Sequence, residues 1–193
     1  ERIVKHWTIR SGSRLAKEKE EETFLRFIYT LVQNSRDHYV SWNRVIETAG
    51  GRVEPTGVMF SSKAGCGKSY LAMKLATALN DKAEIYPKSD STPYWPGYCG
   101  QNVVIWDDFA STVTPAGIEN STAVLQLITS VPSQVNMAAV TEKGMQFTSE
   151  LVIATTNASS DSQYKGVRDD NAIRRRFTWY RIETDEKYRT PAG

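Results

Sequence analysis

The sequence predicts one α/β domain, a three-layer fold in which a mostly parallel central sheet lies between helices. Three observations support this prediction. Short apolar runs alternate with stretches of helical periodicity from position 57 onward, which is the order of strands and crossover helices in a parallel sheet. Two of the runs, 103–106 and 151–154, are continuously apolar, as strands buried on both faces require. Finally, 193 residues with 40% hydrophobic content are enough for one domain with its own core.

The first 51 residues predict a helical extension that precedes this domain. A charged run at 16–22 leads into apolar positions spaced as on one face of a helix, and a second helix is expected over 35–48. We therefore divide the chain into an extension, 1–51, and a domain, 52–193. The extension is expected to pack on the core, and a linker or a subunit contact is the alternative.

Within the domain, strands and helices follow one another in a regular order. Strands are expected at 58–60, 84–86, 103–106, 151–154 and 177–182, and helices at 68–80 and 123–131. Prolines and glycines fill the stretch 87–100, which predicts a loop. The sequence Glu142-Lys143-Gly144 predicts the tip of a hairpin.

Charge and composition narrow the classes of function. The net charge is only +2, so a nucleic-acid partner would have to be held by a local basic patch. Two cysteines cannot supply a typical structural zinc site. Cys66 and Cys99 are expected to be free thiols in a reducing compartment. No apolar run reaches the about 18 residues of a membrane span. The chain begins at Glu1 rather than at a methionine and ends in Thr-Pro-Ala-Gly, so we interpret it as a piece of a longer protein.

Positions 62–69 read SKAGCGKS and predict a phosphate-binding loop, because an apolar strand precedes them and a helical pattern follows. Gly65 and Gly67 can adopt backbone angles that let several N–H groups converge on phosphate oxygens at a helix N-terminus. Lys68 would reach the outer phosphates, and the Ser69 hydroxyl would bind Mg²⁺. A chance glycine-rich turn is the alternative. The residues expected to bind the nucleotide are Ser62, Lys63, Ala64, Gly65, Cys66, Gly67, Lys68, Ser69 and Tyr70.

Polar side chains follow two of the predicted strands. Asp107 and Asp108 come directly after the run 103–106, at the strand end where open parallel sheets hold ligands. We assign Asp107 to Mg²⁺ and Asp108 to the attacking water. Asn157 follows the run that begins at position 151. Placed in space between the two earlier strands, its amide would hold the same water. A surface turn is the alternative for the acidic pair and for the asparagine.

Two basic segments complete the set of candidates. Arg174-Arg175-Arg176 precede the last predicted strand, where they could be solvated, bind nucleic acid, or supply an arginine finger to the transferring phosphoryl group. A finger that acts in trans would require a ring of subunits. Lys143, at the hairpin tip, could grip a phosphate backbone, although the residues alone favour a solvated turn lysine.

Taken in order, these motifs resemble a known family. The segments GCGKS, VVIWDDF, NMAAVTEKGMQFTS, LVIATTNAS and RRRF are similar to those of the superfamily 3 helicases of small RNA viruses. The closest resemblance is to the two-C helicase-ATPase of picornaviruses and picorna-like viruses, and it covers positions 52–182. The resemblance implies an AAA+-like P-loop NTPase core that hydrolyses ATP with Mg²⁺ at the interfaces of a homo-oligomer. It further implies a hexameric ring around single-stranded RNA during genome replication.

The resemblance also assigns roles by position. Arg175 and Arg176 match the arginine fingers of the family, Asn157 matches its polar sensor, and Lys143 falls in the loop that lines the central channel. The family works in the host cytoplasm at membrane-associated replication complexes. We expect any membrane contact to be made only through segments that are absent from this chain.

Two departures leave alternatives open. Ser62 stands where the family has the first glycine of its phosphate loop, and Ala110 and Ser111 follow the acidic pair where the family often has a glutamine. The helicase domain of a replication initiator from a circular single-stranded DNA virus is one alternative, since that family shares a similar Asp-Asp and Lys-Gly pattern. A non-hydrolysing nucleotide-binding interaction module is the other, and only Ser62 supports it.

Overall fold

The computed structural model describes residues 6–9, 26, 51–79, 83–111, 113–158, 164 and 167–184. The sequence predicts one helix that begins in the charged run 16–22 and a second over 35–48. Both lie outside the described residues, apart from Arg26 in the first. In the part of the chain that is described, no helix is both long and apolar enough to span a membrane.

The described strands form one six-stranded sheet in the order β1-β6-β2-β5-β4-β3. Every pairing in this sheet is parallel, which confirms the predicted parallel architecture. Because all strands run the same way, their carboxyl ends meet at one edge, where open α/β sheets hold their ligands. The strands are β1 (His6–Ile9), β2 (Thr56–Ser61), β3 (Ile85–Ser89), β4 (Val103–Asp107), β5 (Leu151–Thr156) and β6 (Phe177–Thr184).

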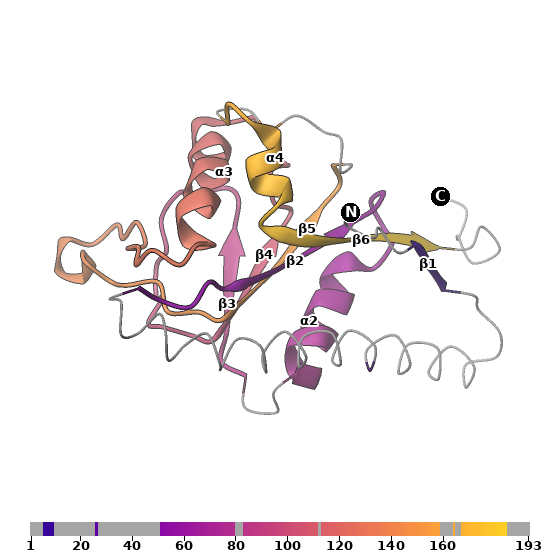
Figure 1. Cartoon of the computed structure of the whole chain (residues 1–193), viewed down its shortest axis with the longest axis horizontal. Coiled ribbons are helices and arrows are strands. Elements are labelled where there is room, and N and C mark those ends of the chain that lie inside the picture. The colour runs from indigo at the N-terminus through magenta and orange to yellow at the C-terminus, as the bar shows by residue number, and fades with distance from the viewer. Residues whose placement is uncertain are drawn as a thin grey trace.

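Helices cover both faces of the sheet, as the sequence predicts (Figure 1). Helix α2 (Lys68–Leu79) packs on one face, and α3 (Pro115–Leu127) and α4 (Asp170–Arg174) lie on the other. Successive side chains of a strand point to opposite faces. Met59 of β2 therefore belongs to the core beneath α3, while its neighbours Val58 and Phe60 belong to the core beneath α2. This double burial explains why the strand sequences are continuously apolar.

Two predicted boundaries are wrong. The third helix begins at Pro115, where Thr114 caps it by accepting a hydrogen bond from the Gly117 amide at 3.3 Å, eight residues before the predicted start. It ends at Leu127, and Val131, expected on its inner face, is 64% exposed. Strand β3 continues through Pro87 into the predicted loop, which is possible because β3 is an edge strand.

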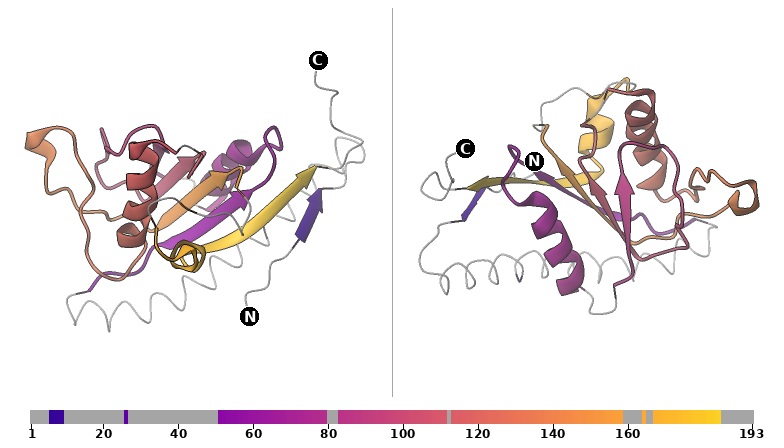
Figure 2. Two further views of the ribbon diagram at one scale, coloured as in Figure 1. Left: turned by 90° about the horizontal axis from the view of Figure 1, so that it is seen from above. Right: turned by 180° about the vertical axis from the view of Figure 1, so that it is seen from behind.

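The segment between α3 and β5 extends away from the sheet (Figures 1 and 2). Outside the named strands, the antiparallel bridge Gln134–Gln146 joins its two arms. Its tip is a short 3-10 helix, η1 (Val140–Glu142), followed by Gly144 with φ of +94°. The predicted turn at 142–144 therefore caps a protruding loop rather than a regular hairpin.

Candidate functional site

The predicted phosphate loop joins β2 to α2 at the carboxyl edge of the sheet. Gly65 (φ +81°) and Gly67 (φ +76°) adopt the left-handed conformation that glycine accepts without strain. The loop ends at the N-terminus of α2, where unpaired N–H groups and the helix dipole favour an anion. A cavity of about 320 Å³ opens there, and its lining residues are Ala64, Gly65, Gly67, Lys68, Ser69, Tyr70, Asp108 and Asn157.

Ser62 does not strain the loop. Among the described residues, the only non-glycine positions with positive φ are Asp108 and Ala110, so the backbone at Ser62 has an ordinary conformation. Its hydroxyl donates to the carbonyl of Lys63 at 2.8 Å. A glycine is therefore not needed at this position for the loop to form.

Lys68 is a charged residue that is almost fully buried, with 7% of its surface exposed. Its ammonium donates to the Asn157 side-chain oxygen Oδ1 at 2.7 Å and to the carbonyls of Lys63 and Ser62 at 3.2 and 3.4 Å. These acceptors are neutral, and a phosphate oxygen that carries charge would be a stronger one. The ammonium is thus placed to exchange a neutral amide for an incoming anion.

A hydroxyl and a carboxylate meet beside this lysine. The Ser69 hydroxyl donates to Asp107 Oδ1 at 2.8 Å, which joins the first turn of α2 to the end of β4. Mg²⁺ prefers oxygen ligands and is commonly held by one or two carboxylates together with substrate phosphates and water. The pair Ser69 and Asp107, next to a phosphate loop, fits that pattern.

Thr155 is a member of the site that the sequence did not single out. Its hydroxyl donates to Asp107 Oδ1 at 2.6 Å and accepts from the Asp108 amide at 3.0 Å. The signal was present in the sequence: two threonines, Thr155 and Thr156, end an otherwise apolar strand that is buried on both faces. Only the register between β4 and β5 shows which groups its hydroxyl would meet.

The turn after β4 sets the position of the second carboxylate. Asp108 and Ala110 both have left-handed backbone angles, φ of 51° and 57°. Aspartate tolerates this region better than most residues, and alanine does so at a cost. The turn leaves the exposed Asp108 side chain on the wall of the cavity, opposite the phosphate loop.

The strand order brings the predicted sensor between the two other motifs. Strand β5 lies between β2, which carries the phosphate loop, and β4, which carries the acidic pair. Asn157 follows β5 directly and contacts Lys68, so it sits between the two motifs in space, as the sequence predicted.

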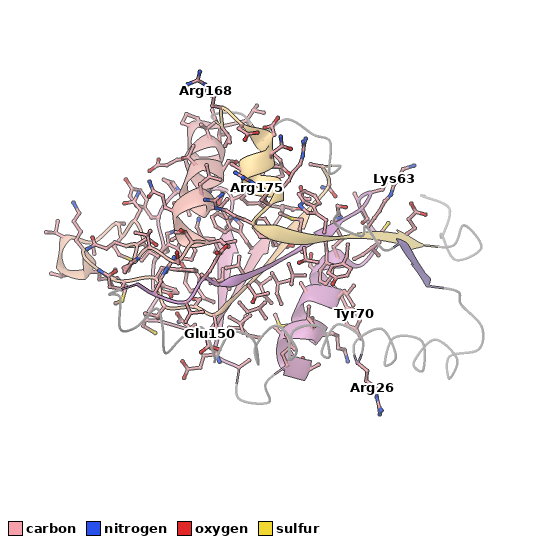
Figure 3. All side chains as sticks on the ribbon, in the orientation of Figure 1. Arg26, Lys63, Tyr70, Glu150, Arg168 and Arg175 are labelled. Atoms are coloured by element: carbon pink, nitrogen blue, oxygen red, sulfur yellow. The ribbon has the colours of Figure 1, made fainter. Side chains whose placement is uncertain are left out.

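The arginines lie at a different end of the sheet. Arg176 precedes Phe177, the first residue of β6, and Phe177 pairs with Gly57 at the start of β2. The phosphate loop follows the other end of β2, about 13 Å further along the strand. In Figure 3, Lys63 on the loop and Arg175 beside α4 lie apart from each other. The cavity and the arginines of one chain are therefore not brought together.

Arg175 and Arg176 differ in their surroundings. Arg175 is exposed at the end of α4. The guanidinium of Arg176 donates to the carbonyls of Leu125 at 2.9 Å and Ala172 at 2.7 Å, and to Ile128 at 3.1 Å. Burial lowers the pKa of Arg176. Within this chain, Arg176 joins the ends of α3 and α4.

Lys143 lies on the tip of the protruding loop, away from the cavity. The tip residues from 138 to 144 are all exposed, and the Val140 side chain has 79% of its surface exposed. The base of the loop leads into the amino end of β5. The tip is therefore accessible to a large partner while its base remains attached to the sheet.

Comparison with known proteins gives matches over most of the described domain. Residues 58–158 match the family model described as RNA helicase. The RNA1 polyprotein of Broad bean wilt virus 1 is 30% identical over 77% of this chain, and the genome polyprotein of Simian hepatitis A virus genotype V is 38% identical over 68%. Among solved structures, the Aeropyrum pernix ORC2 protein in its ADPNP and ADP complexes has a TM-score of 0.41 and 14% identity, over 77% of this chain and 47% of that one.

The polyprotein relatives are far longer than this chain. The match spans 8% of the first of them and 6% of the second.

Proposed function

This chain belongs to the RNA helicase family, and from that membership we propose that it is the ATP-hydrolysing superfamily 3 helicase domain of a picorna-like positive-strand RNA virus, acting in genome replication. The single observation that carries the proposal is the convergence of three motifs on one cavity. Lys68 contacts Asn157 at 2.7 Å, and Ser69 contacts Asp107 at 2.8 Å. Phosphate loop, acidic pair and sensor thus meet as ATP hydrolysis requires.

Each side chain has a separate role in the proposed reaction. Lys68 leaves Asn157 Oδ1 for a terminal phosphate oxygen, because the charged oxygen is the stronger acceptor. The released Asn157 oxygen and the Asp108 carboxylate then accept hydrogen bonds from the attacking water and orient it. Ser69 and Asp107 would hold Mg²⁺, which when bound neutralises charge on the phosphates. The remaining loop residues, Ser62 to Gly67, and Tyr70 complete the proposed nucleotide site.

We assign the arginine finger to Arg175 of a neighbouring subunit. The position of Arg175, at the opposite end of the sheet from its own phosphate loop, supports action in trans. Arg176 was predicted as a second finger, but its hydrogen bonds to α3 and α4 support a structural role. A homo-oligomeric ring, a hexamer in the full-length protein, would place each Arg175 against the next cavity.

The protruding loop is the proposed contact for single-stranded RNA. Lys143 is exposed at its tip, where an ammonium can bind backbone phosphates without reading the base sequence. The relatives are polyproteins of RNA viruses, which supports RNA over the single-stranded DNA alternative. We place the activity in the host cytoplasm at membrane-associated replication complexes, with membrane contact made by other parts of the polyprotein.

The non-hydrolysing alternative rested on Ser62, and the ordinary backbone angle there supports an intact phosphate loop. Phosphate release from ATP, measured over a series of protein concentrations, tests the proposal. We expect turnover by the wild type, stimulation by single-stranded RNA, and loss of turnover in Lys68→Ala. Arg168→Ala, which removes an exposed cation far from the cavity, is the matched control (Figure 3). Normal ATP hydrolysis by Lys68→Ala would contradict the assignment of Lys68 to the phosphates.

A further inference from the structure

Tyr70 is an exposed aromatic residue inside the nucleotide cavity. It belongs to the first turn of α2 and lines the cavity of about 320 Å³, yet 58% of its surface is exposed. Figure 3 shows it on α2. A large ring left open beside a binding cavity is a surface available to a ligand.

A neighbouring cation holds this ring. The ammonium of Lys74 lies 5.5 Å from the centroid of the Tyr70 ring. Residues four apart are neighbours on a helix surface, and a cation over an aromatic face is attracted by its quadrupole. The contact limits the freedom of the ring while leaving most of it accessible, which lowers the entropy lost when a ligand binds to it.

The helix geometry separates Tyr70 from the phosphate end of the site. Successive residues of an α-helix point about 100° apart, so the Tyr70 side chain projects about 200° around the axis from Lys68. Lys68 turns inward to Asn157, and Ser69 turns toward Asp107. A triphosphate held by these groups would leave its other end, the nucleoside, on the side of Tyr70.

We propose that Tyr70 is a stacking platform that holds the nucleobase of a bound nucleoside triphosphate by its π-face. This inference rests on the proposed function, which assigns the other polar side chains of the cavity to the phosphates, Mg²⁺ and water. Among the described lining residues, Tyr70 is the large side chain that this assignment leaves over. Stacking on an aromatic ring tolerates every base because each has a π-face, whereas selection requires hydrogen bonds to base edges.

Binding measurements on the 193-residue chain separate the base from the phosphates. Calorimetric titration with Mg²⁺ and the non-hydrolysable imidotriphosphates of adenosine, guanosine, cytidine and uridine gives four dissociation constants, and inorganic tripolyphosphate gives a fifth that contains no base. We expect the four nucleotides to bind wild type more tightly than tripolyphosphate. Tyr70→Leu should weaken nucleotide binding about tenfold or more and leave tripolyphosphate binding unchanged. Tyr70→Phe, which keeps the ring, should bind like wild type.

Tyr94→Leu is the matched control, because Tyr94 is also exposed and is not among the residues that line the cavity. The proposal is overturned if Tyr70→Leu weakens nucleotides and tripolyphosphate equally or leaves both unchanged. Wild type that binds tripolyphosphate as tightly as nucleotides removes this inference alone. Wild type that binds neither removes the proposed function as well.

Discussion

Thr155 holds the acidic pair in place through one buried hydroxyl. The residue is fully buried, donates to Asp107 Oδ1 at 2.6 Å and accepts from the Asp108 amide at 3.0 Å. Valine has nearly the same shape but makes neither bond. In Thr155→Val we therefore expect the Mg²⁺ concentration for half-maximal ATP hydrolysis to rise, and kcat to fall, each about 10- to 100-fold, as on loss of other groups that orient metal ligands.

The neighbouring position supplies the control for this prediction. Thr156 is equally buried on the same strand, and its hydroxyl accepts from the Ala158 amide at 3.1 Å rather than contacting the acidic pair. Thr156→Val should lose stability but keep the Mg²⁺ dependence of the wild type. If both valine variants shift the Mg²⁺ dependence alike, Thr155 has no specific role in positioning Asp107.

Lys88 is a buried ammonium that makes stability depend on pH. It is 2% exposed, donates to the Ser89 carbonyl at 2.7 Å and lies 5.2 Å from the centroid of the Trp106 ring. Burial lowers the pKa of Lys88 from 10.5 to about 8, and the charge of Asp90 opposes that shift. Between pH 8 and 10 the native lysine has lost its proton while the unfolded one keeps it. Unfolding therefore takes up a proton, and stability rises with pH in this window.

Comparison of the wild type with Lys88→Met isolates that effect. The free energy of unfolding by urea, measured from pH 7.5 to 10, should rise for the wild type relative to the variant by up to about 3 kcal/mol. Burial also raises the pKa values of Tyr86 and Tyr164 to about 12, but both chains share these residues and the difference removes them. Parallel curves for the two chains would show that Lys88 stays charged in the fold.

At the scale of elements, the strands were predictable because a strand buried on both faces is apolar at consecutive positions. The runs at 103–106 and 151–154 form β4 and β5. The first half of α3 has no apolar periodicity from which it could be predicted. Its buried Asn120 and Ser121 are polar, and they bond to the Asp90 and Gly117 carbonyls at 3.1 and 2.9 Å. Apolar periodicity cannot reveal a helix whose buried face carries polar side chains.

The candidate site divides in the same way. Lys68, Ser69 and Asp107 could be found because each belongs to a short local motif at the end of a strand. The role of Arg176 could not, because two of its partners, the carbonyls of Leu125 and Ile128, lie about 50 positions earlier in the chain. Arg52 likewise donates to the Thr129 carbonyl, at 3.0 Å, just beyond the end of α3. Two arginines distant in sequence thus satisfy the C-terminal end of one helix, as only the folded chain can show.

The close approach of β2 and β6 at Gly57 leaves no room for a side chain. A Cβ atom on Gly57 would lie 2.2 Å from the carbonyl oxygen of Arg176 and 2.9 Å from the Phe177 ring. The first of these neighbours is backbone and cannot rotate away. Gly57→Ala should therefore force the strands apart and cost about 1–3 kcal/mol, which lowers Tm by about 2–12 °C. Thermal unfolding beside Thr56→Ala on the same strand checks this, and an unchanged Tm would mean that the strands can separate freely.

At the scale of the whole molecule, the sheet has two ends with different tasks. Its carboxyl edge carries the proposed nucleotide cavity, and Arg175, the proposed finger, precedes β6 at the other end. The pairing of β6 with β2 keeps Arg175 of a chain at the end of the sheet opposite its own Lys68. One chain should therefore be inactive alone, and turnover per chain should rise with protein concentration until rings form.

Mixing two inactive variants tests this division of tasks directly. Lys68→Ala removes the phosphate contact but keeps Arg175, whereas Arg175→Ala keeps the cavity but lacks the finger. Each variant alone should release little phosphate. If the two assemble at random in equal amounts, about a quarter of the interfaces pair an intact cavity with an intact finger, so the mixture should recover about a quarter of wild-type turnover. Full activity in Arg175→Ala alone would contradict the assignment of Arg175 as the arginine finger. A mixture no more active than its components would show that the arginine does not act across an interface.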